Sequence, residues 1–255
     1  MAIIAALLES RSSILTLRRA MPRGGPAVAS CRGPGGLARL LETRLVDAIV
    51  TAPRLAGTTG AAQLFARFPG VPRLMYAPFR PDDGEVLESC HRSGLGVAVE
   101  GVDDAVLGDL IGRMSLSAER RRALSDAPRV LRLHEKLQRD VWDYLIINVA
   151  TPIRTEEVAE RFEVSREHLS RQFGAGGAPN LKRVIDLTRI ACAAQLLSNP
   201  GYSSGTVARV LGFASSSHLS DTARRVAGIA AQGLARIGPR GVLGVFVKGK
   251  TRSRE

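Results

Sequence analysis

The chain has 255 residues, of which 45% are hydrophobic, so it is long enough for two domains with cores of their own. Its formal net charge of +12 favours a polyanionic partner, although charge alone does not separate DNA from RNA or an anionic membrane surface. The apolar start, MAIIAALL, is too short to span a bilayer and lacks the basic leader of a signal peptide, so we expect no membrane segment.

The positive charge is concentrated in the second half of the chain. Residues 1–127 carry 16 Lys and Arg against 13 Asp and Glu, a net charge of +3, whereas residues 128–255 carry 20 against 11, a net charge of +9. Each phosphate that such a surface neutralises releases condensed counterions, which favours binding. The second half is therefore the expected nucleic-acid-binding part.

The three cysteines, Cys31, Cys90 and Cys192, are unclustered. They lack the spacing of metal ligands, and an odd number of cysteines suits a reducing cytoplasm better than a disulfide scaffold. We expect buried free thiols, a cytoplasmic protein, and neither a metal nor a cofactor.

Short apolar runs and helix-like stretches alternate through the first half. This alternation predicts an α/β domain with a parallel sheet and helices on both of its faces. The expected strands are 12–20, 26–31, 45–51, 71–77 and 95–101, and the expected helices are 36–44, 60–68, 83–94 and 103–114.

The order of these elements resembles a receiver domain of two-component signalling, over residues 1–115. A receiver ends its third strand on a phosphate-accepting aspartate, but here that position is Thr51. No acidic pair follows the first expected strand to hold Mg²⁺, and Glu100 stands where the last strand usually has lysine. We expect a degenerate receiver that is not phosphorylated but could dimerise, bind a ligand or dock a partner.

The stretch SCHRSG, residues 89–94, allows an enzymatic alternative. Cys90, His91 and Arg92 resemble the core of the alkyl-acceptor motif of DNA alkyltransferases, in which histidine activates the cysteine. Ser89 replaces the leading proline of that motif. The other interpretation, which we favour, is ordinary C-terminal capping of a helix by His91, Arg92 and Gly94.

After Met114 the pattern becomes helical. Residues 116–126 and 129–150 are expected helices, separated by Ala127 and Pro128. We expect residues 116–150 to form a helical connector together with the first helix of the following domain.

Residues 151–173, TPIRTEEVAERFEVSREHLSRQF, predict two helices joined by a tight turn. Thr155 and Ser165 are the expected N-caps. The expected inward residues are Val158, Ala159, Phe162, Leu169 and Phe173, which leaves Arg166, Glu167, His168, Ser170, Arg171 and Gln172 for the exposed face of the second helix.

Residues 203–226 repeat this arrangement. Ser203 or Ser204 caps the first helix, Gly212 supplies the turn because glycine takes a positive φ without strain, and Ser215 caps the second helix. If Phe213 and Leu219 are buried, the residues left exposed near the helix start are Ser216, Ser217, His218 and Ser220. These side chains could contact base edges, as the start of a recognition helix does. The alternative is that they only cap and solvate the helix. The helical part of residues 180–201, about 27 Å long, would link the two units over a distance similar to the ~34 Å between successive major-groove faces.

This layout resembles the AraC-type (AraC/XylS) DNA-binding domain over residues 128–236, on the segments VSREHLSRQF, LTRIACAAQLL and VARVLGFASSSHLS. Arg189 matches the linker-helix arginine of the family, and we expect it to form a structural ion pair. The resemblance implies base contacts from Glu167, Ser170, Arg171, Ser216, Ser217, Ser220 and Asp221. We add Arg166 and His218 to the expected site residues because they lie near the starts of the same two helices.

The sequence departs from the family pattern at several positions. Glu163 stands where the first turn usually has glycine, at a cost of about 1–2 kcal/mol if the left-handed geometry is kept. Asp221 replaces a basic residue and would repel phosphate. Ala223, Ala227 and Ala231 replace two aromatic residues and a proline, so we expect a poorly packed second unit. Residues 237–255 lie outside the pattern and are expected as a basic tail.

These observations predict a cytoplasmic, bacterial-type transcription regulator that is not an enzyme. It would bind double-stranded DNA through residues 151–236, with RNA polymerase as a further partner and a homodimer formed through the N-terminal domain. The alternative is a protein-interaction module that has lost DNA binding through the departures from the family pattern.

Overall fold

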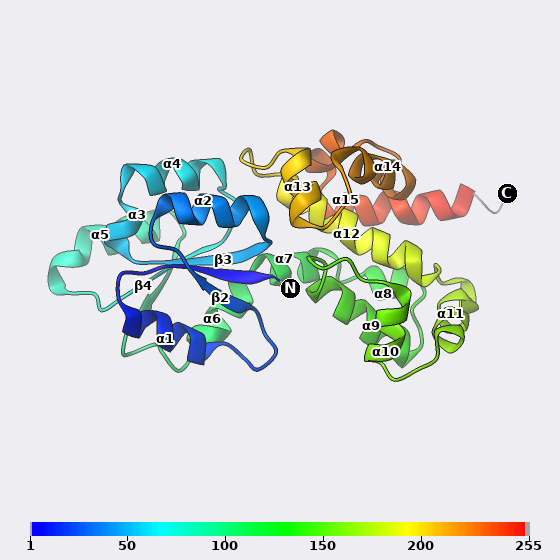
Figure 1. Cartoon of the computed structure of the whole chain (residues 1–255), viewed down its shortest axis with the longest axis horizontal. Helices are drawn as coiled ribbons and strands as arrows, with labels where there is room; N and C mark the ends of the chain where they lie inside the picture. The colour runs from blue at the N-terminus through cyan, green and yellow to red at the C-terminus, as the bar shows by residue number, and fades with distance from the viewer. Residues whose placement is uncertain (1, 253–255) are drawn as a thin grey trace. The chain divides into compact units, whose positions relative to one another are not determined.

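The computed structural model describes residues 2–252, which divide into two compact units between Ala118 and Glu119. The division falls within α7 (Leu116–Ala123), close to the expected start of the connector. The first unit is α/β and the second is entirely helical (Figure 1).

The first unit is built on one sheet of five parallel strands in the order β2-β1-β3-β4-β5. This order is one of the two common arrangements of doubly wound α/β folds and is the order of receiver domains. The expected α/β class is therefore confirmed. The strands are β1 (Ile3–Leu7), β2 (Ala27–Ser30), β3 (Val46–Thr51), β4 (Arg73–Ala77) and β5 (Gly96–Val99).

The start of the chain differs from the sequence-based prediction. The first strand is β1, a wholly buried run that pairs with both β2 and β3, whereas residues 12–20 are not a strand but lie in helix α1 (Arg11–Ala20). Ser10 caps α1 by accepting a hydrogen bond from the Ser12 amide at 3.1 Å. Ser13 and Leu17, four residues apart, form its buried side, which is a helical spacing. The segment between the first strand and α1 is therefore Leu8, Glu9 and Ser10.

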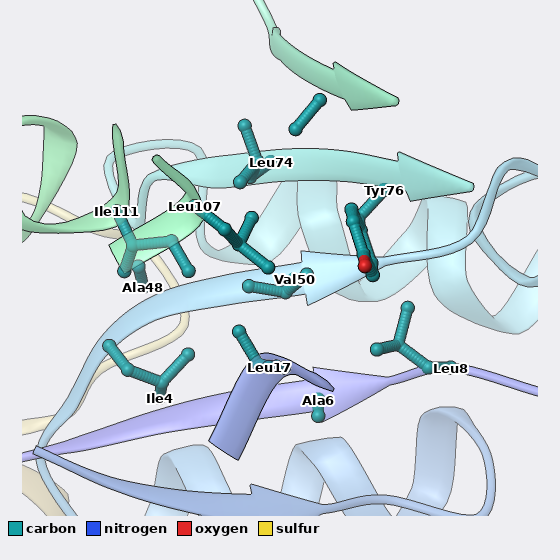
Figure 2. Packing of buried hydrophobic residues seen from close by; sticks show 11 residues of the cluster. Ile4, Ala6, Leu8, Leu17, Ala48, Val50, Leu74, Tyr76, Leu107 and Ile111 are labelled. Carbon is teal, nitrogen blue, oxygen red and sulfur yellow. The ribbon is translucent and has the colours of Figure 1, made fainter. Parts of the chain in front are cut away.

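Helices cover both faces of the sheet. Leu74 and Tyr76 of β4 point to the face covered by α1 and α6 (Leu107–Met114), where they pack with Leu17 and Ile111 (Figure 2). Because side chains alternate along a strand, Arg73 and Met75 point to the opposite face. The remaining elements of this unit are α2 (Pro34–Thr43), α3 (Pro53–Ala56), α4 (Thr59–Arg67), η1 (Pro81–Asp83) and α5 (Gly84–Arg92).

Helix α6 begins four residues later than predicted because two aspartates organise the preceding turn. The Asp103 carboxylate accepts a hydrogen bond from the Val99 amide at 2.7 Å. The Asp104 carboxylate accepts from the Gly101 amide at 3.0 Å and from the Tyr76 hydroxyl at 2.6 Å. These bonds join the turn to the ends of β4 and β5.

The second unit contains two helix pairs joined by a long, largely buried helix (Figure 1). The expected helix over 129–150 is broken at Arg132, whose φ of 60° is incompatible with a helix. The helices are α8 (Ala127–Val130), α9 (Lys136–Ile147), α10 (Thr155–Arg161), α11 (Arg166–Gly174), η2 (Ala175–Gly177), α12 (Leu181–Leu197), α13 (Ser204–Val210), α14 (Ser216–Ala227) and α15 (Ala231–Arg252).

The expected basic tail is not a tail over the residues that the structure describes. Helix α15 bends at Gly238, whose φ is 60°, and then continues to Arg252 against α12. Val242, Leu243 and Phe246 are buried, and their spacing forms one apolar side of the helix. Residues 253–255 of the expected tail lie outside the described residues. Between residues 2 and 252, no helix is long and apolar enough to span a bilayer.

Candidate nucleic-acid interface

The two helix pairs turn through the same backbone motif. In the first pair the Val164 amide donates to the Ala159 carbonyl at 3.0 Å, and in the second the Phe213 amide donates to the Ala208 carbonyl at 2.8 Å. Both bonds close a Schellman motif around a residue in the left-handed conformation. That residue is Glu163 (φ 55°) in the first turn and Gly212 (φ 65°) in the second, so Glu163 does keep the strained geometry.

Serine caps begin three of the four helices. The hydroxyls of Ser165, Ser203 and Ser215 accept hydrogen bonds from the amides of His168, Thr206 and His218 at 3.0–3.1 Å. Each bond satisfies an amide that has no partner within the helix. The expected cap at Thr155 is wrong, because Thr155 is already the first residue of α10 and Arg154 precedes it as the cap.

The second turn is one residue longer than the first. Ser165 directly follows Val164, whereas Ala214 stands between Phe213 and Ser215. Gly212 is required here for a second reason besides its positive φ, since a Cβ at this position would come within 2.5 Å of the Pro152 Cγ. The segment before α10 therefore packs against the turn of the second helix pair.

Helix α11 presents a polar face with two arginines. Leu169 and Phe173 are buried as predicted, and α9 holds the end of the helix because the Gln138 side chain donates to the Gln172 carbonyl at 2.7 Å. Arg166 lies 3.3 Å from Glu156 in an exposed ion pair. The predicted site residues Arg166, Glu167, His168, Ser170 and Arg171 are all exposed, and Gln172 is half-buried.

Helix α14 presents small hydroxyls at its start. Ser216, Ser217 and His218 are exposed, and the His218 ring makes an edge contact with the Phe213 ring at 5.5 Å between centroids. Ser220 also makes a structural contact, because the residue is half-buried and its hydroxyl accepts a hydrogen bond from the Ala231 amide at 3.3 Å. It joins the start of α15 to α14.

The exposed Asp221 forms an ion pair with Arg224 at 2.9 Å. Both residues lie at a hollow of about 540 Å³ between the starts of α13 and α14. From the sequence, Ser203 and Ser204 are expected only as caps. Arg224 is not among the expected site residues, although its spacing of three residues from Asp221 is that of a helical ion pair. The hollow is lined by Ser203, Ser204, Gly205, Ser216, Ser217, Ser220, Asp221, Arg224 and Gln232.

Arg189 of α12 holds the second turn in place, but not through the expected ion pair. Its guanidinium donates to the Leu211 carbonyl at 2.9 Å and stacks over the Phe213 ring at 3.8 Å. Burial lowers the pKa of Arg189, and the nearby Asp186 carboxylate opposes this shift. Asp186 itself pairs with Arg225 of α14 at 2.9 Å. Arg189 thus fixes the second turn to α12, and Arg225 fixes α14 to the same helix.

The second helix pair is compact rather than loosely packed. Ala223, Ala227 and Ala231 are buried, with side-chain positions at most 1% exposed. Their small side chains leave room for α15 to pack against both α14 and α12. The expected loss of packing does not occur because α15, which sequence analysis interpreted in part as a tail, supplies the missing apolar surface.

The alkyl-acceptor alternative does not fit the surroundings of Cys90. The residue is 2% exposed, and burial raises the pKa of its thiol, whereas an activated cysteine needs a lowered pKa. His91 and Arg92 lie in the last turn of α5, where Arg92 pairs with Glu88. These residues end the helix, as the capping interpretation predicted.

Replacing Glu163 by glycine should stabilise the second unit. The change relieves the left-handed strain of about 1–2 kcal/mol, less about 0.5–1 kcal/mol for the added freedom of the unfolded chain. Urea unfolding followed by the fluorescence of Trp142, the one tryptophan of the chain, should show a gain of about 0.5–1 kcal/mol. Glu160→Gly, in the regular part of α10, should lower the stability, and a loss in both variants would contradict the strain.

Comparison with known proteins agrees with this geometry. A family model described as "Helix-turn-helix domain" matches residues 158–236, which hold α11 to α14 together with most of α10 and the start of α15. No curated protein matches the chain. The crystal structure of full-length FixJ from B. japonicum is similar at 14% identity over 87% of this chain and 96% of that one, with a TM-score of 0.36. Residues 158–236 thus form a helix-turn-helix domain of the AraC type, and this domain follows a unit with the strand order of a receiver.

Proposed function

We propose that this protein regulates transcription by reading one DNA site with two recognition helices, α11 and α14. The observation that carries the proposal is the repeated unit: the same Schellman turn and the same serine cap precede two helices with exposed polar starts. Helix α12 joins the units and, with 17 residues, is about 25 Å long. That length is compatible with helices placed in neighbouring turns of the major groove.

The two helices would contribute differently to binding. Helix α11 offers Arg171 without an ion pair among the described residues, and arginine is suited to bidentate contacts with guanine or to phosphate. Helix α14 offers Ser216 and Ser217, whose short hydroxyls can approach bases and phosphates closely. The proposed base-contacting residues are therefore Glu167, Ser170, Arg171, Ser216 and Ser217, with Arg166 and His218 beside them, whereas Asp221 would lie near phosphate.

We further propose that the receiver-like unit acts without phosphorylation. Thr51, fully buried, ends β3 where an aspartate would accept phosphate. Glu100 follows β5 where a lysine is expected, and it accepts a hydrogen bond from the Ser13 hydroxyl at 2.7 Å. Glu9 is the one acidic residue between β1 and α1. These residues therefore supply neither a carboxylate that could accept phosphate nor the pair of carboxylates that would bind Mg²⁺ in a receiver domain.

Dimerisation of this unit and contact with RNA polymerase are two further parts of the proposal. Three apolar side chains of this unit are exposed, namely Leu15 of α1 and Val102 and Val106 before α6. Exposed apolar side chains are often found at protein interfaces, which supports dimerisation. Dimerisation can be measured by sedimentation of the full chain over a range of concentrations. Contact with RNA polymerase can be measured by retention of polymerase on the DNA-bound protein.

Arg171→Ala should weaken specific DNA binding by about 1–3 kcal/mol and relax the sequence preference at one position. The site is first selected from genomic fragments that the wild-type protein retains, and affinity is then measured by fluorescence anisotropy. Arg129→Ala, which removes an exposed arginine of α8, is the matched control and should change little. Unchanged affinity for Arg171→Ala would remove Arg171 from the interface. No retained fragments at all would favour the protein-interaction alternative.

Asp221→Arg should tighten DNA binding and steepen its salt dependence by about one to two units in the log–log slope. The change removes a carboxylate that faces phosphate and frees Arg224 from its ion pair. Asp109→Arg on α6, also an exposed acid, makes the same change in net charge away from this surface and should leave the slope unaltered. Loss of specific binding by Asp221→Arg would instead show that Asp221 accepts a hydrogen bond from a base.

Acetyl phosphate with Mg²⁺ should neither label the protein nor change its DNA affinity. Mass spectrometry of the intact chain detects a phosphoryl group directly, and hydroxylamine distinguishes an acyl phosphate from a phosphate ester. A hydroxylamine-labile phosphoryl group within residues 1–115 would overturn the proposal for the receiver-like unit. A receiver domain with its aspartate intact serves as the positive control.

A further inference from the structure

The first unit contains a cavity that the proposed function does not use. It has a volume of about 630 Å³ and lies on the face of the sheet opposite α1 and α6, between α3, α4 and α5. Cavities of 300–1,000 Å³ are typical of small-molecule sites. Its apolar wall includes Phe65, Met75, Val86 and Leu95.

The cavity exists because α5 closes only part of the sheet. Cys90 is the one buried residue of this helix, and Val86 and Leu87 are half-buried. A helix that covers a sheet normally buries a full apolar stripe against it. The main contacts of α5 are instead with β5 and η1. A hollow therefore remains between α5 and the side chains of β4 and α4 that line it, although Phe65 and Met75 are themselves only 6% exposed.

Arg73, the first residue of β4, provides the charge of this cavity. Its guanidinium carbon lies 4.9 Å from the centroid of the Phe65 ring. Stacking on a ring orients the guanidinium plane and leaves its N–H edge available. The Nε atom is buried and has no hydrogen-bond partner among the described residues. A buried donor without a partner is rare in native proteins and calls for an explanation.

No neighbouring anion within residues 2–252 neutralises Arg73. Burial raises the pKa of Cys90, which keeps this thiol neutral near pH 7. Glu85, the acidic residue that lines the cavity, is exposed and forms no ion pair with Arg73 in the described part of the chain. Burial lowers the pKa of Arg73 itself, but a guanidinium stays charged at physiological pH. One uncompensated positive charge therefore faces an apolar cavity.

From this cavity and its unpaired guanidinium, we infer that the first unit binds a small carboxylic acid with an apolar body. The carboxylate would accept hydrogen bonds from the terminal N–H groups of Arg73, and the apolar body would lie against Phe65, Met75 and Val86. A ligand of this class would pair with the Arg73 charge and contact the apolar wall at the same time. The inference concerns the first unit alone and does not depend on DNA binding by the second.

The test uses the full chain without DNA and the probe 4-phenylbutyrate, measured by isothermal titration calorimetry. Saturable binding with one site per chain is expected. The neutral analogue 4-phenylbutyramide and the short acid acetate should each bind at least ten-fold more weakly, since one lacks the charge and the other the apolar body. Equal affinity for the acid and the amide, or no saturable binding of the acid, would overturn the inference without any variant.

Two arginine variants locate the site. Arg73→Gln should weaken binding of 4-phenylbutyrate at least ten-fold and leave that of the amide unchanged. Arg67→Gln is the matched control, because Arg67 also stacks on a phenylalanine, Phe68, but does not line the cavity. Val86→Trp should abolish binding by filling the space. Equal weakening by Arg73→Gln and Arg67→Gln, or full binding by Val86→Trp with circular dichroism unchanged in each case, would place the ligand elsewhere and refute the inference.

Discussion

The contact between Arg189 and the second turn is the interaction on which the DNA-binding unit depends. It joins α12, the most deeply buried helix, to the backbone carbonyl of Leu211 and to the ring of Phe213. The same ring contacts His218 at the start of α14. A hydrogen bond to a charged donor contributes about 1.5–3 kcal/mol, and a desolvated cation–π contact adds to it. The orientation of the second recognition helix thus follows from α12.

The two helix pairs reach the same geometry with different side chains. In the first, a large Phe173 is buried, and α9 supports the helix through Gln138. At the corresponding place of the second, Ala223 is small, and α15 packs closely against α14. The turns show the same exchange, since Glu163 tolerates the left-handed conformation in an exposed turn, whereas Gly212 has no alternative beside Pro152. The backbone motif, rather than the residues that form it, is what the two units share.

The features that depend on a few adjacent residues could be predicted from the sequence. Serine caps at Ser165 and Ser215, the glycine turn and four of the five strands were correctly located, because each depends on a few adjacent residues. The first strand was missed because Ile3–Leu7 lies in the apolar run at the start of the chain, which was considered only as a membrane or signal segment. Helix α15 was interpreted in part as a tail because its partner, α12, begins 50 residues earlier in the chain. The partners of Arg189 could not be inferred because a carbonyl acceptor leaves no mark in the sequence.

The structure also changes the meaning of the residues that depart from the family pattern. A charged side chain in an exposed turn and small side chains beside a well-placed helix cost less than the same changes would in a rigid core. Asp221 is partly neutralised by Arg224, so its repulsion of phosphate is reduced before DNA arrives. Ser220, withdrawn to hold α15, leaves fewer groups at the surface of α14. Affinity would then come mainly from the arginines of α11, with α14 contributing selectivity through short hydroxyls that act only when the groove is close.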